Sequence, residues 1–295
     1  MRYSLNLLAA TVFLVSSPVE AVVTDNLSTA KSVVNEEVKI AQVEGKKQRR
    51  DEALRLNKLG TQQLRRGEYR EALNNFEQAL VIFIEIGERK SEGAVINNIG
   101  GVYRNLGEYP KALNYYQRSL AIDKEVGDKQ GEGTTLSNIG GIYFHLGEYA
   151  KALDYYQQAL AIQKKVSNKS AEGTIINNIG EVFRNLGEYA KAFDYYQQAL
   201  AIRKQVGDKA GEGKTLNNIG NVYYNLGEYA KALDYYQQAL AIAKQVGNKS
   251  GEGETLNNIA IVLQAQKQPK LAIVFYKKSV STYEQIRKQL KTLPK

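Results

Sequence analysis

The sequence predicts an all-α protein, a right-handed α-solenoid built from six consecutive helix-turn-helix units. Three observations support this prediction. The same words recur along the chain with a period of 40 residues. Within each repeat, apolar residues are spaced as on one face of a helix. Glycine and Asx residues return at fixed places, where helices are expected to end and begin.

The repeat is clearest in five words that match in step: Ile96–Gly100, Leu136–Gly140, Ile176–Gly180, Leu216–Gly220 and Leu256–Ala260. A second word, LGEYAKALDYYQQALAI, begins at Leu146 and again at Leu226, and near-identical copies begin at Leu106 and Leu186. A degenerate first copy contains Leu56–Gly60, and a degenerate last copy has Ala272 at the matching position. The count is therefore six units.

Before the repeats, residues 1–21 have the pattern of a secretory signal peptide. Arg2 is basic, Leu5–Val15 is apolar but too short to span a bilayer, and Val19 and Ala21 suit cleavage after Ala21. We therefore expect an exported protein, periplasmic or extracellular, or a cytoplasmic one if the leader is not functional. We expect no stable membrane insertion.

Residues 22–50 are predicted to be a helical cap or linker, in which residues 27–44 cover the first unit. The alternative is a frayed, solvated helix. The array is expected over residues 51–290, and 291–295 form a basic tail. Its units are predicted at about 51–88, 89–128, 129–168, 169–208, 209–248 and 249–290.

Each unit is predicted to contain two helices. In one unit, Ile176 and Ile179 mark the first helix, and Ala192 and Tyr196 mark the second. Gly187, between them, suits a left-handed helix end. Natural N-caps precede the first helices of four units: Asp128, Asn168, Asp208 and Asn248. Small residues such as Gly140 and Ala152 are expected where the two helices approach closely.

The set Gly140, Tyr143, Ala152, Tyr156 and Ala159 resembles the signature of the tetratricopeptide repeat (TPR) family. The unit is six residues longer than the usual repeat, and in this it is similar to the repeats of kinesin light chain and of polarity adaptors. Bacterial, especially cyanobacterial, chains with near-identical repeats also resemble it. The resemblance implies a scaffold or adaptor for protein binding, with no enzymatic activity.

Stacked hairpins are expected to leave a concave groove lined by first helices. Asparagine pairs recur there although Asn disfavours helix interiors. One interpretation is that their amides bind a peptide backbone, and the other is that they brace neighbouring helices. We expect the first Asn of each pair to brace and the second to bind. The second residues are Asn98, Asn138, Asn178, Asn218 and Asn258.

Other groove positions vary between otherwise near-identical repeats, as a surface that selects its ligand would. They are Arg104, Asn105, Phe144, His145, Arg184, Asn185, Tyr224 and Asn225. The arginines suit carboxylates of an acidic or extended peptide, and the aromatic rings suit apolar contacts. The alternative is a solvated face without a ligand. His145, at one of these variable groove positions, is expected to be a surface contact.

The composition argues against most other functions. The chain has one His and no Cys, so we expect no metal, no cofactor and no catalytic residues. The net charge of +9 is concentrated in residues 39–70 and 264–295, whereas 71–263 is close to neutral. Because binding to a phosphate backbone needs a continuous basic surface, we expect no nucleic-acid partner.

Two alternatives to a peptide-binding scaffold stay open. Near-identical units could stack end to end into a self-assembling structural protein, although both basic ends would repel each other. The array could also be an accessory or regulatory subunit of a separate enzyme, since the catalytic part would then be another chain.

Overall fold

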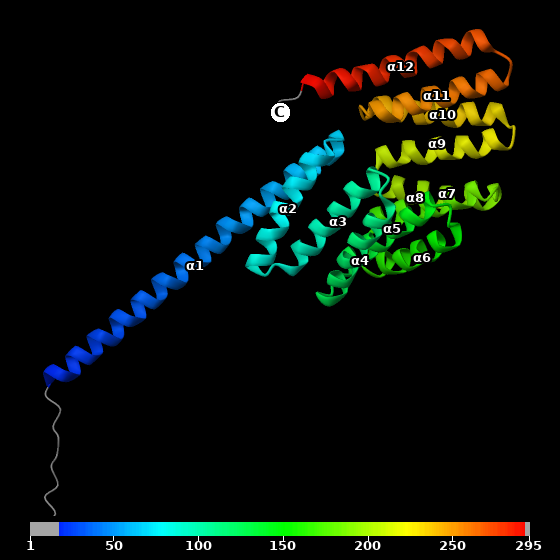
Figure 1. The fold of residues 1–295 in the computed structure, drawn as a ribbon. Helices are drawn as coiled ribbons and strands as arrows, with labels where there is room; N and C mark the ends of the chain where they lie inside the picture. Colours follow the sequence, from blue (N-terminus) through cyan, green and yellow to red (C-terminus); the bar gives the residue numbers. More distant parts are fainter. Residues whose placement is uncertain (1–17, 293–295) are drawn as a thin grey trace, which may run out of the picture. The chain divides into compact units, whose positions relative to one another are not determined.

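The computed structural model describes residues 18–292, and these residues are helical almost throughout (Figure 1). The helices of the described residues are α1 (Pro18–Arg66), α2 (Tyr69–Ile86), α3 (Arg89–Asn105), α4 (Tyr109–Glu125), α5 (Lys129–His145), α6 (Tyr149–Lys165), α7 (Lys169–Asn185), α8 (Tyr189–Gln205), α9 (Lys209–Asn225), α10 (Tyr229–Gln245), α11 (Lys249–Ala265) and α12 (Pro269–Thr292). The predicted all-α class is confirmed.

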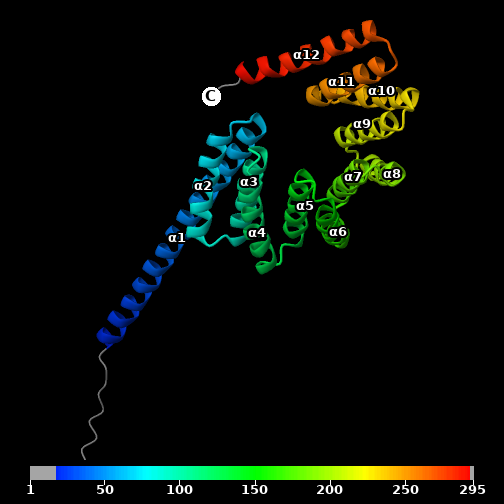
Figure 2. The same ribbon diagram turned by 45° about the vertical axis from the view of Figure 1, so that its right-hand side comes forward.

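The chain divides after Glu52 into two units. The first contains the N-terminal part of α1, and the second is the array of helix pairs. In the array each helix packs on its neighbours in sequence, and the first helices α3, α5, α7, α9 and α11 also contact one another in succession. Figure 2 shows these pairs following one another from α3 to α12. The array is a solenoid of six antiparallel pairs, as predicted.

The predicted helix ends are confirmed. The Oδ1 atom of Asp128 accepts a hydrogen bond from the backbone N–H of Gly131 at 3.1 Å, and Asn168, Asp208 and Asn248 cap their helices in the same way. Gly187 has φ +77°, a left-handed conformation that glycine adopts without a steric penalty. The turns of each unit therefore lie at residues whose capping side chain or backbone conformation suits a helix end.

The core of each inner pair is a tyrosine ring lying against a glycine. A Cβ atom on Gly140 would be 2.9 Å from the ring of Tyr156 and 3.3 Å from the carbonyl oxygen of Ala152. The equivalent tyrosines Tyr116, Tyr196 and Tyr236 are also buried. The close approach predicted at Gly140 and Ala152 is confirmed, because any side chain there would displace the ring.

The structure describes only part of the N-terminal region for which predictions were made. Residues 1–17 of the predicted signal peptide lie outside the described residues, and Pro18 begins α1. Residues 27–44 are helical, but they belong to one helix that continues into the first pair without a break. Their covering role stays a prediction. Among the described residues, none of the helices has the length and apolar character needed to cross a bilayer.

Candidate functional site

A cleft lies along the first helices α7, α9 and α11, and its volume is about 220 Å³. Tyr236, from the second helix α10, closes its floor. The lining residues are Arg184, Asn221, Tyr224, Asn225, Tyr236, Asn258 and Ile261. Four of these were predicted from the sequence, namely Arg184, Tyr224, Asn225 and Asn258. The structure thus brings together site residues from three different repeats.

Side-chain amides join neighbouring pairs in a series of hydrogen bonds, which we call the amide ladder. In each bond, the second Asn of one repeat donates through Nδ2 to Oδ1 of the first Asn in the preceding repeat. The bonds measure 2.9–3.2 Å and run from Asn98 to Asn57, Asn138 to Asn97, Asn218 to Asn177 and Asn258 to Asn217.

The ladder corrects the expected division of roles between the two asparagines. The expectation was that the second Asn would bind a ligand while the first braced, but both residues of each bond brace the repeats. The second residues Asn98, Asn138, Asn218 and Asn258 each donate to the preceding pair. In the described chain no group donates a hydrogen bond to their Oδ1 atoms. None of these atoms is both fully buried and without a partner. Asn98, Asn138 and Asn258 are half-buried and Asn218 is buried, so the ladder is open to solvent only in part.

Asn178 is the exception, and the sequence explains it. The residue that would accept its hydrogen bond is Ser137, whose side chain is shorter than that of the asparagine found in the other repeats. Asn178 is half-buried and makes no side-chain hydrogen bond within the described residues. Its whole amide is therefore available at the centre of the array.

Two arginines give the groove its positive charge. Arg104 and Arg184 occupy the same position two repeats apart, and within the described chain neither forms an ion pair. The Nε atom of Arg184 is buried without a hydrogen-bond acceptor. Because Arg184 as a whole is half-buried and lines the cleft, its guanidinium is suited to a ligand that brings a carboxylate.

The aromatic groove residues pack on rings of the second helices. Phe144 lies 5.9 Å from Tyr149 between ring centroids, and Tyr224 lies 5.9 Å from Tyr229. His145 stacks on Tyr109 at 5.8 Å, so this imidazole contacts an aromatic ring of the preceding pair. These contacts fix the rings in place at the edge of the groove, where Phe144 and Tyr224 stay half-buried.

The remaining predicted residues are more exposed. Asn105 accepts a hydrogen bond from Arg104 at 3.4 Å, and Asn185 donates to the backbone oxygen of Glu181 at 3.0 Å. Asn225 is exposed at the mouth of the cleft. They can contact a ligand but are not held in a fixed position by the neighbouring repeats.

Tyrosine hydroxyls at the floor of the groove are fixed in the protonated form. Burial raises the pKa of Tyr236, and its hydroxyl donates to Oδ1 of Asn221 at 2.6 Å. Burial likewise raises the pKa of Tyr196, and the nearby Arg184 guanidinium partly offsets this rise. These groups stay neutral at physiological pH, so the charged groups of the groove are Arg104, Arg184 and Glu181.

Asn221 and Ile261 also line the cleft, at the position immediately after the signature glycine; this position was expected to face the groove, but the two residues were not among the predicted site residues. Their signal was variation, because this position is Gly101, Gly141, Glu181, Asn221 and Ile261 in successive repeats. In the part of the chain that the structure describes, no cluster of His, Cys, Asp or Glu is placed to hold a metal ion.

Helix pairs that share one continuous core and present first helices along a groove define a helical repeat protein. A tetratricopeptide repeat model matches the chain in overlapping windows, at residues 51–125, 91–165, 131–205, 170–245 and 211–285. The chain belongs to the tetratricopeptide repeat family. A comparison with curated protein sequences gives no match.

Solved structures with the same fold share little sequence with this chain. A Rap protein complexed with Competence and Sporulation Factor has a TM-score of 0.64 and 14% identity, covering 81% of this chain and 76% of its own. The Rap conjugation gene regulator of plasmid pLS20, in complex with the Phr* peptide, has a TM-score of 0.61 and 15% identity. The match covers 80% of this chain and 74% of the regulator. A putative kinesin light chain with nearly identical repeats from Podosopora anserina has a TM-score of 0.51 and 16% identity. The match covers 65% of this chain and 95% of the other.

Proposed function

We propose that this protein is a non-enzymatic scaffold that binds an extended, acidic segment of another protein in the groove of its first helices. The observation that carries the proposal is the cleft shared by α7, α9 and α11, which gathers Arg184, Tyr224 and Asn258. A guanidinium, an aromatic ring and an amide in one concavity suit a peptide with a carboxylate, an apolar side chain and a free backbone.

The amide ladder supports binding of a backbone rather than of one side chain. The Oδ1 atoms of the half-buried residues Asn98, Asn138 and Asn258 can accept hydrogen bonds from peptide N–H groups. Asn178 adds both a donor and an acceptor at the centre. Regular acceptors of this kind hold an extended chain, while the variable positions select among sequences.

The solved relatives add support from the fold alone. The Rap regulator of plasmid pLS20 was solved with a peptide bound, so an array of similar fold can hold one. Kinesin light chain-type repeats share the fold at 16% identity. The type of ligand proposed here comes from the groove residues of this chain and not from those relatives.

A display experiment tests this proposal. We expect wild-type protein to enrich acidic peptides from a random library, since Arg104 and Arg184 lack carboxylate partners. Binding of an enriched peptide, measured by calorimetry, should weaken about 10–100-fold in Arg184→Ala combined with Tyr224→Ala. The triple variant Asn138→Ala, Asn178→Ala and Asn218→Ala should weaken every enriched peptide, whatever its side chains.

The matched control changes exposed residues of the second helices, with Lys164→Ala and Lys204→Ala. This control has two substitutions, as the Arg184→Ala and Tyr224→Ala variant does, and both lie away from the first helices. Peptides that lose affinity equally for the groove variants and for this control would contradict binding in the groove.

Self-association is a second candidate, and α12 is the reason. Its residues Leu271 and Val274 are exposed, at positions that carry Lys231 and Asp234 in the preceding pair. An apolar strip on a terminal helix suits a second copy of the chain. Light scattering over a salt series should then show growth as salt screens the repulsion between basic ends. A constant monomer mass would exclude this candidate.

We also propose that the protein is exported, on the basic, apolar and small-residue pattern of residues 1–21. The test is the N-terminus of protein recovered from the envelope of a host that expresses the full chain. Export with cleavage predicts Val22 as the first residue. Retention of Met1 on cytoplasmic protein would contradict it.

A further inference from the structure

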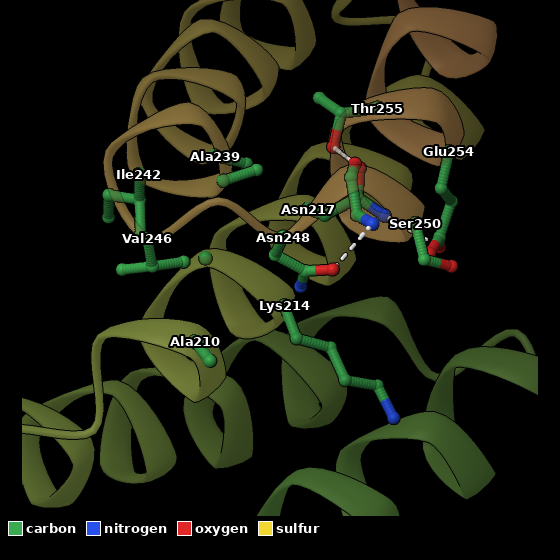
Figure 3. Close-up of a pocket in the computed structure, with 13 residues that line it drawn as sticks. Ala210, Lys214, Asn217, Ala239, Ile242, Val246, Asn248, Ser250, Glu254 and Thr255 are labelled. Atoms are coloured by element: carbon green, nitrogen blue, oxygen red, sulfur yellow. Dashed lines mark hydrogen bonds between the residues drawn. The ribbon is translucent and has the colours of Figure 1, made fainter. Parts of the chain in front are cut away.

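A second cavity lies between α9, α10 and α11, and Figure 3 shows the residues around it. Its volume is about 170 Å³. Two first helices form its sides and the second helix α10 forms its floor. Ala239, Ile242, Ala243 and Val246 supply the apolar part, whereas Lys214, Asn217, Asn248 and Glu254 supply polar groups. Asn217 also belongs to the amide ladder, so the cavity adjoins the groove.

The cavity exists because of one residue, Ala243. The same position in the preceding repeats is occupied by Asp123, Gln163 and Arg203, all of them buried. Asp123 and Arg203 reach the first helix of the next repeat, whereas Gln163 donates to the backbone oxygen of Gln130 in its own repeat. In an array whose repeats are otherwise almost identical, replacement by alanine leaves the space beside Ala243 empty at the boundary between the fifth and sixth pairs.

Arg203 occupies the position equivalent to Ala243 one repeat earlier. Its Nη1 lies 3.4 Å from Oδ2 of Asp208. It also lies beside Gly211, where a Cβ atom would be 1.7 Å from Nη1, so the glycine leaves room for the guanidinium. Gly251 is the equivalent of Gly211 and lines the empty cavity. Gly251 therefore leaves room beside Ala243 for a side chain, as Gly211 does beside Arg203 and Gly131 beside Asp123.

The charges at the cavity favour a cation. Glu254 accepts a hydrogen bond from Asn217 at 3.1 Å but has no ion-pair partner in the described chain. The other charged residue, Lys214, is directed away from Asn248 and Thr255 in Figure 3, and its Nζ lies 3.8 Å from Oε1 of Glu181. Asn248 replaces Asp208, so Glu254 is the one carboxylate that lines this cavity.

We infer that the cavity at Ala243 is a subsite for an arginine side chain of the bound peptide. The stem would pack on Ile242 and Val246, and the guanidinium would pair with Glu254. This inference rests on the proposed function and specifies it further. The ligand would place an arginine over the fifth and sixth pairs and acidic residues near Arg104 and Arg184.

The test uses the whole protein and a small probe, N-acetyl-arginine N-methylamide, so that no peptide needs to be known. Binding is followed by NMR through the backbone amide signals of Gly213 and Gly251. We expect saturable shifts with a Kd on the order of 1 mM. The lysine and glutamine analogues are run at matched ionic strength, and each should bind at least about tenfold more weakly.

Two variants locate the site. Ala243→Leu fills the cavity with an apolar side chain and should abolish the shifts. Glu254→Gln removes the charge but keeps an acceptor for Asn217, and it should weaken the probe about tenfold. Thermal melting of both variants confirms that they remain folded.

A third variant creates a site instead of removing one. Arg203→Ala should open a matching cavity next to Asp208, and the same probe should then also shift Gly173 and Gly211. Two binding sites in this variant and one in the wild type support the inference. Shifts from all three probes alike, or from none, overturn it. The display experiment would still stand in either case, because it depends on the groove and not on this cavity.

Discussion

The inner pairs and the last pair are built from the same repeat but pack differently. In the pairs from α3 to α10, a glycine faces a buried tyrosine, as Gly180 faces Tyr196. In the last pair, Ala260 replaces the glycine, and Tyr276 is only half-buried, with its hydroxyl bonded to Gln264 at 2.9 Å. The tight glycine–tyrosine contact of the pairs from α3 to α10 is therefore relaxed in the pair α11 and α12.

The largest expected effect separates these two environments. Tyr196→Ala should lower the free energy of unfolding by about 3–5 kcal/mol, because it leaves a large cavity in a covered core. Tyr276→Ala should lower it by about 1–2 kcal/mol, because that ring is already partly in water. Urea unfolding followed by circular dichroism measures both. Equal losses would show that the last pair is packed as tightly as the inner ones.

The amide ladder gives the next effect. Asn97 accepts from Asn138 and donates to Thr135 at 2.7 Å, so Asn97→Ala should cost about 1–3 kcal/mol. Ser137→Asn should have the opposite sign and stabilise by about 1 kcal/mol, since it supplies the missing acceptor for Asn178. The same urea experiment applies. A destabilising Ser137→Asn would mean that this step of the ladder is closed to an amide.

Two tyrosine hydroxyls provide a smaller contrast within the inner pairs. Tyr236→Phe should cost about 1 kcal/mol, because Asn221 loses its donor at 2.6 Å. Tyr196→Phe should cost less, since that hydroxyl lies near Arg184 but makes no hydrogen bond of comparable geometry. Melting temperatures of the two single variants decide the matter. The reverse order would contradict this assignment of the hydroxyl contacts.

The smallest effect concerns one turn between inner pairs. Ser167 has φ +57°, where the equivalent residues are Gly127, Gly207 and Gly247. Ser167→Gly should raise the stability by about 0.5–1 kcal/mol, because glycine adopts this left-handed conformation without strain. Gly207→Ser is the matched reverse change and should destabilise by a similar amount. Loss of stability in both variants would show that Ser167 makes a compensating contact.

Much of the fold could be predicted because its determinants are local and repeated. Asp128 as an N-cap and Gly187 as a helix end depend on residues three or four positions away, and both are confirmed. The amide ladder could not be assigned in the same way. Asn138 and Asn97 lie 41 positions apart, and their contact depends on the angle at which successive pairs stack. The sequence shows that these amides recur, but not which of them face each other.

The candidate site was predictable in part for the same reason. Arg184 and Tyr224 stood out as variable positions on first helices, and the structure places both in one cleft. Ala243 gave a weaker signal, because an alanine among apolar residues resembles ordinary core. Its importance appears only when the buried Arg203 is seen to fill the equivalent space.

The central claim is that the first helices bind the ligand, and photo-crosslinking tests it most directly. A benzophenone amino acid is placed at Tyr224 on α9 in one variant and at the exposed Gln238 on α10 in another. With a peptide enriched by display, the account predicts crosslinking from position 224 and little from position 238. Efficient crosslinking from position 238, with none from position 224, would contradict it.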